Sequence, residues 1–159
     1  MGSHKEGWNA CVDYEIGMYA HKNKIAWLNG PFPSGTNDKD VFRSKMKAAI
    51  EKKQLERGNS FRVIADDGYI DRELLSVLSL RNELDPPEIA YYKDCALSRH
   101  ETFNGMTKTY RILKANFRHD RGWNPDYKFP RHQAVVEAIC VTLQYELDFG
   151  IKTLFDPYP

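Results

Sequence analysis

Two short segments with the composition of β-strands place the strongest constraint on the fold. The first is Ala10 to Ala20, ACVDYEIGMYA, and its larger apolar side chains recur at every second position: Val12, Tyr14, Ile16 and Met18. A period of two is typical of a half-buried β-strand. The second is KIAWL, residues 24–28, which follows a polar connection of hairpin length. The sequence therefore predicts an antiparallel β-hairpin near its start.

A loop and a helix are predicted after the hairpin. Residues 29–38, NGPFPSGTND, hold two prolines and two glycines within six residues, which favours an irregular loop. Residues 40–56 form the predicted helix, with Asn37 or Asp38 as its N-cap and with apolar residues roughly on one face: Val41, Met46, Ala49 and Ile50. Gly58 and Asn59 are expected to end it.

Two aspartates follow the third predicted strand. The strand is FRVIA, residues 61–65, and Asp66 and Asp67 stand at its carboxyl end. Open α/β sheets hold their ligands at the carboxyl ends of strands. An Asp-Asp-Gly sequence is also favoured in ordinary turns. Taken alone, these residues are compatible with a simple turn and with one corner of a metal site.

Two further helices are predicted, beyond the weakly patterned residues 72–85. Residues 88–117 lack proline and carry an apolar stripe: Phe103, Met106, Tyr110, Leu113 and Phe117. Polar residues recur on the other side of the same helix: Glu101, Asn104, Lys108 and Arg111. The last helix, residues 132–149, has a single charge in AVVEAICVTL, so we expect it to be buried on most sides and to end at Gly150.

Composition adds limits on domain number and compartment. A chain of 159 residues is about one domain. Its 23 Lys and Arg nearly balance its 22 Asp and Glu, so the overall charge gives no evidence for or against a nucleic-acid partner. Three separated cysteines, Cys11, Cys95 and Cys140, indicate reduced intracellular thiols rather than a disulfide framework. No long apolar run or leader is present, so we expect a soluble protein without a membrane partner.

Four motifs occur in an order that resembles a known family. They are GPFPSGTNDKDVFR, VIADDGYI, SRHETFNGMTKTYRIL and FRH, followed by the apolar helix and a Leu-Phe ending. From about Ser3 to Phe155 the chain resembles the DDE superfamily endonuclease domain of Harbinger-type transposases and transposase-derived nucleases. The resemblance implies one α/β domain over residues 1–159, with an RNase H-like mixed sheet and flanking helices. It also implies a divalent metal (Mg²⁺ or Mn²⁺) as cofactor, DNA as the substrate and a nuclear location. A separate DNA-binding subunit or domain is a further partner that the resemblance allows.

The resemblance also implies roles for individual residues. Asp66 falls on the second catalytic aspartate and Glu101 on the third carboxylate, with 34 residues between them. The weaker metal candidates are acids near the other motifs: Asp67, Asp38 and Asp13. Asp38 is more simply a helix cap, and Asp13 lies opposite Val12 and Tyr14 in the strand alternation. His100 could touch a metal or a phosphate, but a hydrogen-bonded helix histidine is the simpler interpretation.

Basic residues after Glu101 are candidates for contacts with DNA phosphates. They are Lys108, Arg111, Lys114 and Arg118, in a basic stretch that begins at Arg99. A cutting domain needs such contacts, although a solvated helix face explains these residues equally well.

One element of the family pattern is not matched. The family carries its first catalytic aspartate in an Asp-Gly-Thr strand, ahead of the segment that begins here at Ser3. We therefore expect the first strand to be missing and the chain to correspond to the C-terminal portion of a DDE endonuclease domain. Two functions follow. One is a metal-dependent DNA endonuclease or transposase domain that is inactive as this fragment. The other is a non-catalytic transposase relic or a domesticated DNA- or protein-binding module.

Overall fold

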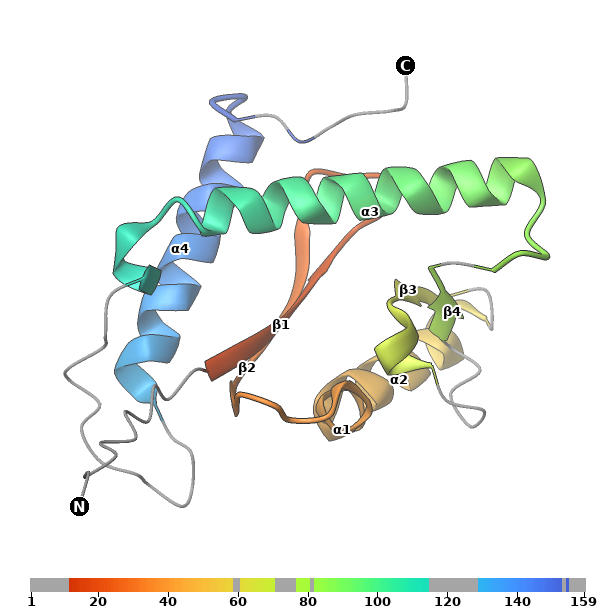
Figure 1. Cartoon of the computed structure of the whole chain (residues 1–159), viewed down its shortest axis with the longest axis horizontal. Coiled ribbons are helices and arrows are strands. Elements are labelled where there is room, and N and C mark those ends of the chain that lie inside the picture. Colours follow the sequence, from red (N-terminus) through yellow and green to blue (C-terminus); the bar gives the residue numbers. More distant parts are fainter. Residues whose placement is uncertain are drawn as a thin grey trace, which may run out of the picture.

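The structure, a computed structural model, describes residues 12–58, 61–70, 77–80, 82–114, 129–152 and 154. These residues form a mixed α/β arrangement of helices and two small sheets (Figure 1). The strands are β1 (Val12–Met18), β2 (Ile25–Pro33), β3 (Val63–Ala65) and β4 (Val77–Ser79). The helices are α1 (Asp38–Val41), α2 (Lys47–Arg57), α3 (Pro87–Thr107) and α4 (Pro130–Asp148).

The predicted hairpin is confirmed, and its second strand is longer than expected. β1 pairs antiparallel with β2, and Ile16 lies opposite Leu28. β2 continues through residues 29–33, so the prediction of an irregular loop there was wrong. Its prolines are tolerated because each strand of a two-stranded ribbon has one side without ladder bonds. Gly30 has a φ of 133°, and a Cβ there would lie 2.7 Å from the Tyr14 ring, so only glycine suits this position.

The helix after the hairpin contains a π-helical segment. Asn37 is the N-cap, since its Oδ1 accepts a hydrogen bond of 2.9 Å from the Lys39 N–H. A π-helical segment, Phe42–Met46, joins α1 to α2. The predicted apolar face omitted Phe42, which is fully buried and packs in one core cluster with Met46 and Ile50. Gly58, with a φ of 81°, ends α2 as predicted.

The second sheet is parallel and very short. β3 pairs with β4, and Val63 lies opposite Val77. The sequence predicts β3 but not β4, because three residues are too few to show an alternation. Val77 packs in a core cluster with three residues of the π-helical segment and α2: Phe42, Met46 and Ile50.

α3 ends ten residues before the predicted boundary at residue 117. Its last residue is Thr107, and a separate 3₁₀ turn, η3 (Arg111–Lys114), follows. The apolar stripe nevertheless shares one environment, because Met106, Tyr110 and Leu113 pack around the cluster that contains Phe103. The stripe thus belongs to a helix and a turn, while Phe117 lies outside the described residues.

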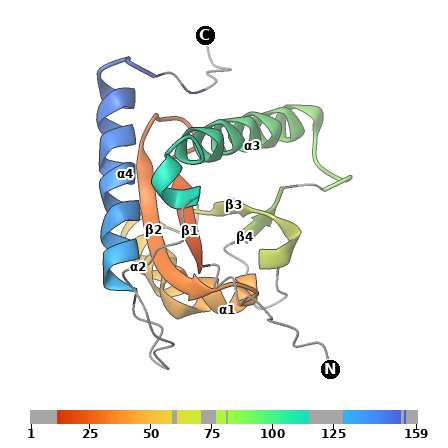
Figure 2. The ribbon, with the colours of Figure 1, turned by 60° about the vertical axis from the view of Figure 1, so that its left-hand side comes forward.

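α4 buries one stripe rather than most of its surface. Its buried residues are Val136, Ile139, Cys140, Leu143 and Leu147. Val141, Tyr145 and Phe149 are 70%, 57% and 67% exposed, so the prediction of burial on most sides was wrong. The helix has one packed side because it lies along the hairpin, as Figure 2 shows, while α3 crosses nearby. Cys95 and Cys140 are buried free thiols. Among the described helices, none is long and apolar enough to cross a membrane.

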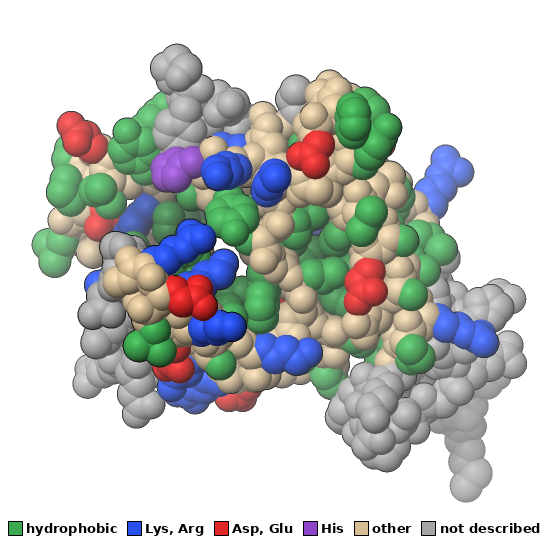
Figure 3. Space-filling view, turned by 180° about the vertical axis from the view of Figure 1, so that it is seen from behind, with side chains coloured by type: hydrophobic (Ala, Val, Ile, Leu, Met, Phe, Trp, Pro, Cys, Tyr) green, Lys and Arg blue, Asp and Glu red, His purple; other side chains and the backbone are tan. Residues whose placement is uncertain are grey.

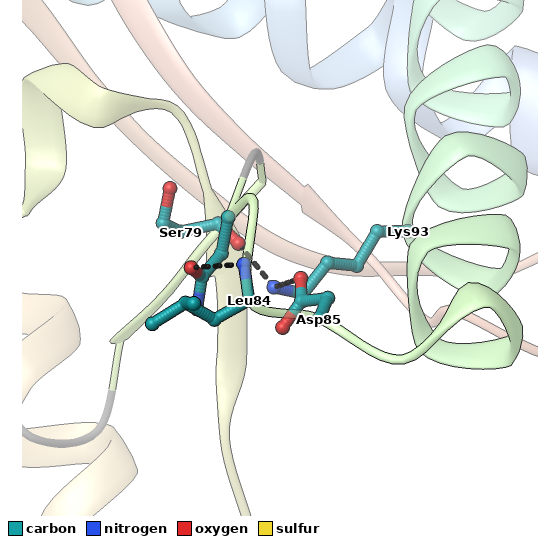
Figure 4. Close-up of polar contacts among 5 residues, drawn as sticks. Ser79, Leu84, Asp85 and Lys93 are labelled. Atoms are coloured by element: carbon teal, nitrogen blue, oxygen red, sulfur yellow. Dashed lines mark hydrogen bonds and ion pairs between the residues drawn. The ribbon is translucent and has the colours of Figure 1, made fainter.

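Two buried cations on α3 fix the sheets to this helix. Lys93 Nζ lies 2.5 Å from Asp85 Oδ2 and donates a hydrogen bond of 2.6 Å to the Ser79 carbonyl at the end of β4 (Figure 4). Arg99, 3% exposed, donates to the Ala20 carbonyl and to Asn23 Oδ1 in the hairpin turn. α3 is therefore held to both sheets by polar contacts as well as by packing.

Candidate metal and DNA site

Asp66 stands where the sequence predicts it, directly after β3. It is exposed, and its carbonyl accepts a hydrogen bond of 3.0 Å from the Tyr69 N–H. This bond closes a 3₁₀ turn, η2 (Asp67–Tyr69), which presents Asp66 at the carboxyl end of the strand. The side chain of Asp67 lies outside the described residues.

Asp38 reaches the same turn from the start of α1. Asn37 takes the capping role, so the expectation that Asp38 is a cap was wrong. A Cβ at Gly68 would collide with Asp38 Oδ2, which means that the exposed Asp38 carboxylate lies against η2. Glycine permits this approach because it has no side chain. Two acids that are far apart in the sequence are thus brought to one turn.

Glu15 on β1 is an acidic residue that the sequence analysis missed. It is 5% exposed, and its Oε2 accepts hydrogen bonds from Trp27 Nε1 at 2.7 Å and from Asn29 Nδ2 at 3.5 Å. Its Oε1 is buried without a hydrogen-bond partner. Glu15 lies opposite Asn29 in the hairpin, a register that the alternation of the sequence does not reveal. Asp13, which was considered instead, is exposed.

Tyr69 experiences the charges of all three carboxylates. Burial raises the pKa of Tyr69 to about 12, and the negative charges of Glu15, Asp38 and Asp66 add to the shift. Burial also raises the pKa of Glu15; its hydrogen bonds with Trp27 and Asn29 oppose this, and the charge of Asp38 adds to it. We call Glu15, Asp38 and Asp66 the acidic cluster.

Glu101 is exposed on α3, beside a histidine with a structural role. His100 Nε2 lies 3.1 Å from the Ile16 carbonyl, and its Nδ1 lies 3.3 Å from Asn104 Nδ2. Both ring nitrogens therefore make protein contacts, which supports the simpler interpretation of His100. These contacts orient the Glu101 segment of α3 against β1. The approach of Glu101 to Asp66 stays a prediction.

The basic candidates differ in accessibility. Lys108 follows α3, Arg111 begins η3, and both are exposed. Arg99 is excluded as a phosphate contact because it is buried against the hairpin turn. The side chain of Lys114 and all of Arg118 lie outside the described residues. Figure 3 shows further Lys and Arg side chains on one face of the molecule. Exposed basic residues also occur along the π-helical segment and α2: Arg43, Lys45, Lys52 and Arg57.

The donor chemistry suits a divalent metal, but the described residues do not complete a site. Mg²⁺ prefers carboxylate and other hard oxygen ligands. Within residues 12–58, 61–70, 77–80, 82–114, 129–152 and 154, no three His, Cys, Asp or Glu side chains are grouped closely enough to hold a metal ion.

A comparison with protein families decides the broader assignment. Residues 3–144 match the DDE superfamily endonuclease family, a range that includes Asp38, Asp66 and Glu101. The chain belongs to this family. DDE superfamily endonucleases are generally divalent-metal-dependent nucleases that act on DNA, and their fold is generally RNase H-like. The mixed α/β arrangement agrees with this class of protein. No curated protein and no solved structure matched the chain.

Proposed function

We propose that this chain is part of a Harbinger-type transposase nuclease domain that cleaves DNA phosphodiester bonds, with Asp66 and Glu101 as metal-binding carboxylates. The observation that carries the proposal is the position of Asp66, which is an exposed carboxylate at the end of β3 within the family match. We assign Glu101 to the family's third carboxylate, as the sequence resemblance implies, and it is exposed on α3.

The roles of the residues follow from their chemistry. Asp66 and Glu101 would supply carboxylate oxygens, the kind of ligand that Mg²⁺ prefers. When bound, two such ions stabilise the attacking and leaving oxygens of an in-line displacement. Lys108 and Arg111, both exposed, are the residues to which we assign pairing with DNA phosphates, which would position the strand. We assign no separate protein nucleophile.

A third carboxylate is needed for the family's reaction. The described residues lack a group of three metal ligands, and we propose that the aspartate of an Asp-Gly-Thr strand completes the site. Such a strand would pair with an open edge of β1 or β3, since each belongs to a separate two-stranded sheet among the described residues. The 159-residue chain alone is then expected to be a poor nuclease.

The second candidate function is a non-catalytic DNA- or protein-binding module derived from a transposase. The lack of a complete group of metal ligands among the described residues favours this second candidate. This candidate keeps the fold and the basic contacts but has no turnover. The two candidates differ in one measurable property, which is metal-dependent cleavage.

A plasmid nicking assay separates the two candidates. Supercoiled DNA is incubated with Mg²⁺ or Mn²⁺ and with the chain alone, the chain extended by an Asp-Gly-Thr strand, or the extended chain with Asp66→Ala. We expect nicking by the extended chain only, and its loss in Asp66→Ala. Glu51→Gln, an exposed change on α2, serves as the matched control and should keep the activity.

Two results would change the proposal. No nicking by the extended chain, with DNA binding intact, would favour the binding module. Clear nicking by the unextended chain that disappears in Asp66→Ala would show a site that is complete without the added aspartate. Asp13 or Asp38 would then become the candidate third ligand.

A further inference from the structure

α4 carries a second stripe of regularly spaced residues, on the side opposite its buried stripe. All of its members are exposed: Arg131, Ala134, Ala138, Val141, Tyr145 and Asp148. We call these residues the exposed stripe. The buried stripe, which includes Ile139 and Leu143, lies about half a turn away around the helix axis. A helix needs one apolar stripe to pack on its own domain, so packing among the described residues does not account for the exposed stripe.

The middle of the exposed stripe presents adjoining apolar side chains to solvent. Val141 is 70% exposed and Tyr145 is 57% exposed. Phe149, at 67%, extends this surface, because its ring centroid lies 4.3 Å from that of Tyr145. Figure 2 shows α4 along one edge of the molecule. Exposed apolar side chains that adjoin one another mark interaction sites, whereas single ones do not.

The spacing of the exposed stripe indicates the kind of partner. Its steps alternate between three and four residues from Arg131 to Asp148. This is the a and d spacing of a heptad repeat, with which two helices pack side by side. The stripe runs along the whole of α4, which has 19 residues and is therefore about 28 Å long. The matching partner is another helix with the same spacing, and α4 of a second copy has it.

The charges at the two ends of the stripe favour an antiparallel pair. Arg131 lies in the first turn of α4 and Asp148 is its last residue. Antiparallel packing brings Arg131 of each copy to Asp148 of the other, whereas parallel packing brings like charges together. Gln144 Nε2 donates a hydrogen bond of 2.8 Å to Asp148 Oδ1 and so orients this carboxylate. Opposed helix dipoles favour the antiparallel direction as well.

The same register also matches side-chain sizes. When the two charges are opposite each other, Ala134 lies opposite Tyr145. In the next layer, Ala138 lies opposite Val141. Each layer thus joins a small side chain to a larger one, and this alternation lets facing helices interdigitate. One register therefore satisfies both the charges and the sizes of the exposed stripe.

We propose that the exposed stripe is the interface of a homodimer, in which α4 of one copy packs antiparallel on α4 of the other. The arrangement has two-fold symmetry, so every contact occurs twice. One helix from each copy makes a small interface, and the dimer should therefore dissociate on dilution. The dimer requires neither a metal nor DNA, so it stands apart from the proposed nuclease function.

Analytical ultracentrifugation over a concentration series tests the dimer in the 159-residue chain. We expect a monomer–dimer equilibrium for the unmodified chain. Val141→Glu should raise the Kd of the dimer by about tenfold or more, because it places an unpaired charge inside the interface. Leu55→Glu is the matched control on α2, where Leu55 is 89% exposed, and it should leave the Kd unchanged. Circular dichroism checks that both variants keep the fold.

A charge exchange tests the partner and its direction. Arg131→Asp and Asp148→Arg, each made alone, place like charges opposite each other at both ends of the interface. Each should raise the Kd by about tenfold. Both substitutions in one chain restore the opposite charges and should restore the dimer. Arg57→Asp makes the same change at an exposed position on α2 and should have no effect.

The outcomes decide between this dimer and other arrangements. A monomer at every concentration would overturn the proposal, and so would a dimer that Val141→Glu leaves intact. Single exchanges that weaken the dimer, without recovery in the double exchange, would overturn the antiparallel register. If Val141→Glu disturbs the fold, the charge exchange still decides the result. The measurements contain no metal or DNA, so a chain that fails to nick plasmid could still form the dimer.

Discussion

The Trp27 indole donates a hydrogen bond of 2.7 Å to Glu15 Oε2, so a carboxylate buried in the hairpin is tied to the strand opposite it. Burial raises the pKa of Glu15 above its ordinary value of 4.5. The folded chain therefore binds this proton more tightly than the unfolded chain does. The contribution of Glu15 to stability is present below pH 4.5 and is lost as the pH rises through its folded-state pKa.

Glu15→Gln should remove this pH dependence. Glutamine keeps an acceptor for Trp27 and carries no charge, so the free energy of unfolding should fall less between pH 4.5 and neutrality than in the unmodified chain. Urea unfolding over a pH series, without divalent metal, measures the difference. Glu51→Gln should keep the original slope. Equal slopes for Glu15→Gln and the unmodified chain would show that Glu15 does not titrate as described.

Tyr69 should ionise with a pKa of about 12, above the ordinary tyrosine value of 10.0. The neutral phenol is favoured in the folded chain, so the free energy of unfolding should fall as the pH rises from 10.0 to about 12. Ultraviolet absorbance of tyrosinate, with Tyr69→Phe to assign the signal, measures the pKa. Asp38→Asn should lower it, whereas Asp40→Asn, on the same short helix, should not. A Tyr69 that titrates with the exposed tyrosines would contradict the convergence of charges.

Lys93→Met should destabilise the chain by about 3–5 kcal/mol, because Asp85 and the Ser79 carbonyl lose their buried cation. Chemical denaturation measures the change. Lys52→Met, at an exposed position on α2, should stay within about 0.5 kcal/mol of the unmodified chain. Adding Asp85→Asn to Lys93→Met should recover part of the loss. A Lys93→Met change within the range of the control would show that the contact between α3 and β4 is unimportant for stability.

Lys108→Gln and Arg111→Gln should weaken DNA binding similarly for all sequences. Each should reduce the salt dependence of binding by about one counterion, as the loss of one phosphate contact predicts. Fluorescence anisotropy with a DNA duplex at several salt concentrations measures both effects. Arg57→Gln on α2 is the control. If Arg57→Gln has the larger effect, the DNA-binding surface lies over α2 instead.

Local sequence patterns predicted the elements that depend on local physics. The alternation from Val12 to Met18 gave β1, and Gly58 marked the end of α2. β4 was missed because its pairing with β3 is a contact between distant segments and spans three residues. The end of α3 was misplaced because the apolar stripe continues through Tyr110 and Leu113, which pack on the same cluster from outside the helix.

The candidate site was predictable only in part for the same reason. Asp66 could be found because it follows a strand and lies in a family motif. Glu15 could not be found from the strand alternation, which gives no sign that Trp27 and Asn29 provide donors for a buried acid. Asp38 was assigned to a cap because its contact with Gly68 depends on how α1 packs on η2. Such contacts arise from tertiary structure.

The proposed metal site joins Asp66 and Glu101. Anomalous scattering from crystals grown with Mn²⁺ tests it most directly, because it locates the ions relative to both side chains. We expect Mn²⁺ density in contact with Asp66 and Glu101, from one ion or from two ions about 3.5–4 Å apart. Carboxylates more than about 10 Å apart, too far for two such ions to join them, would contradict the claim.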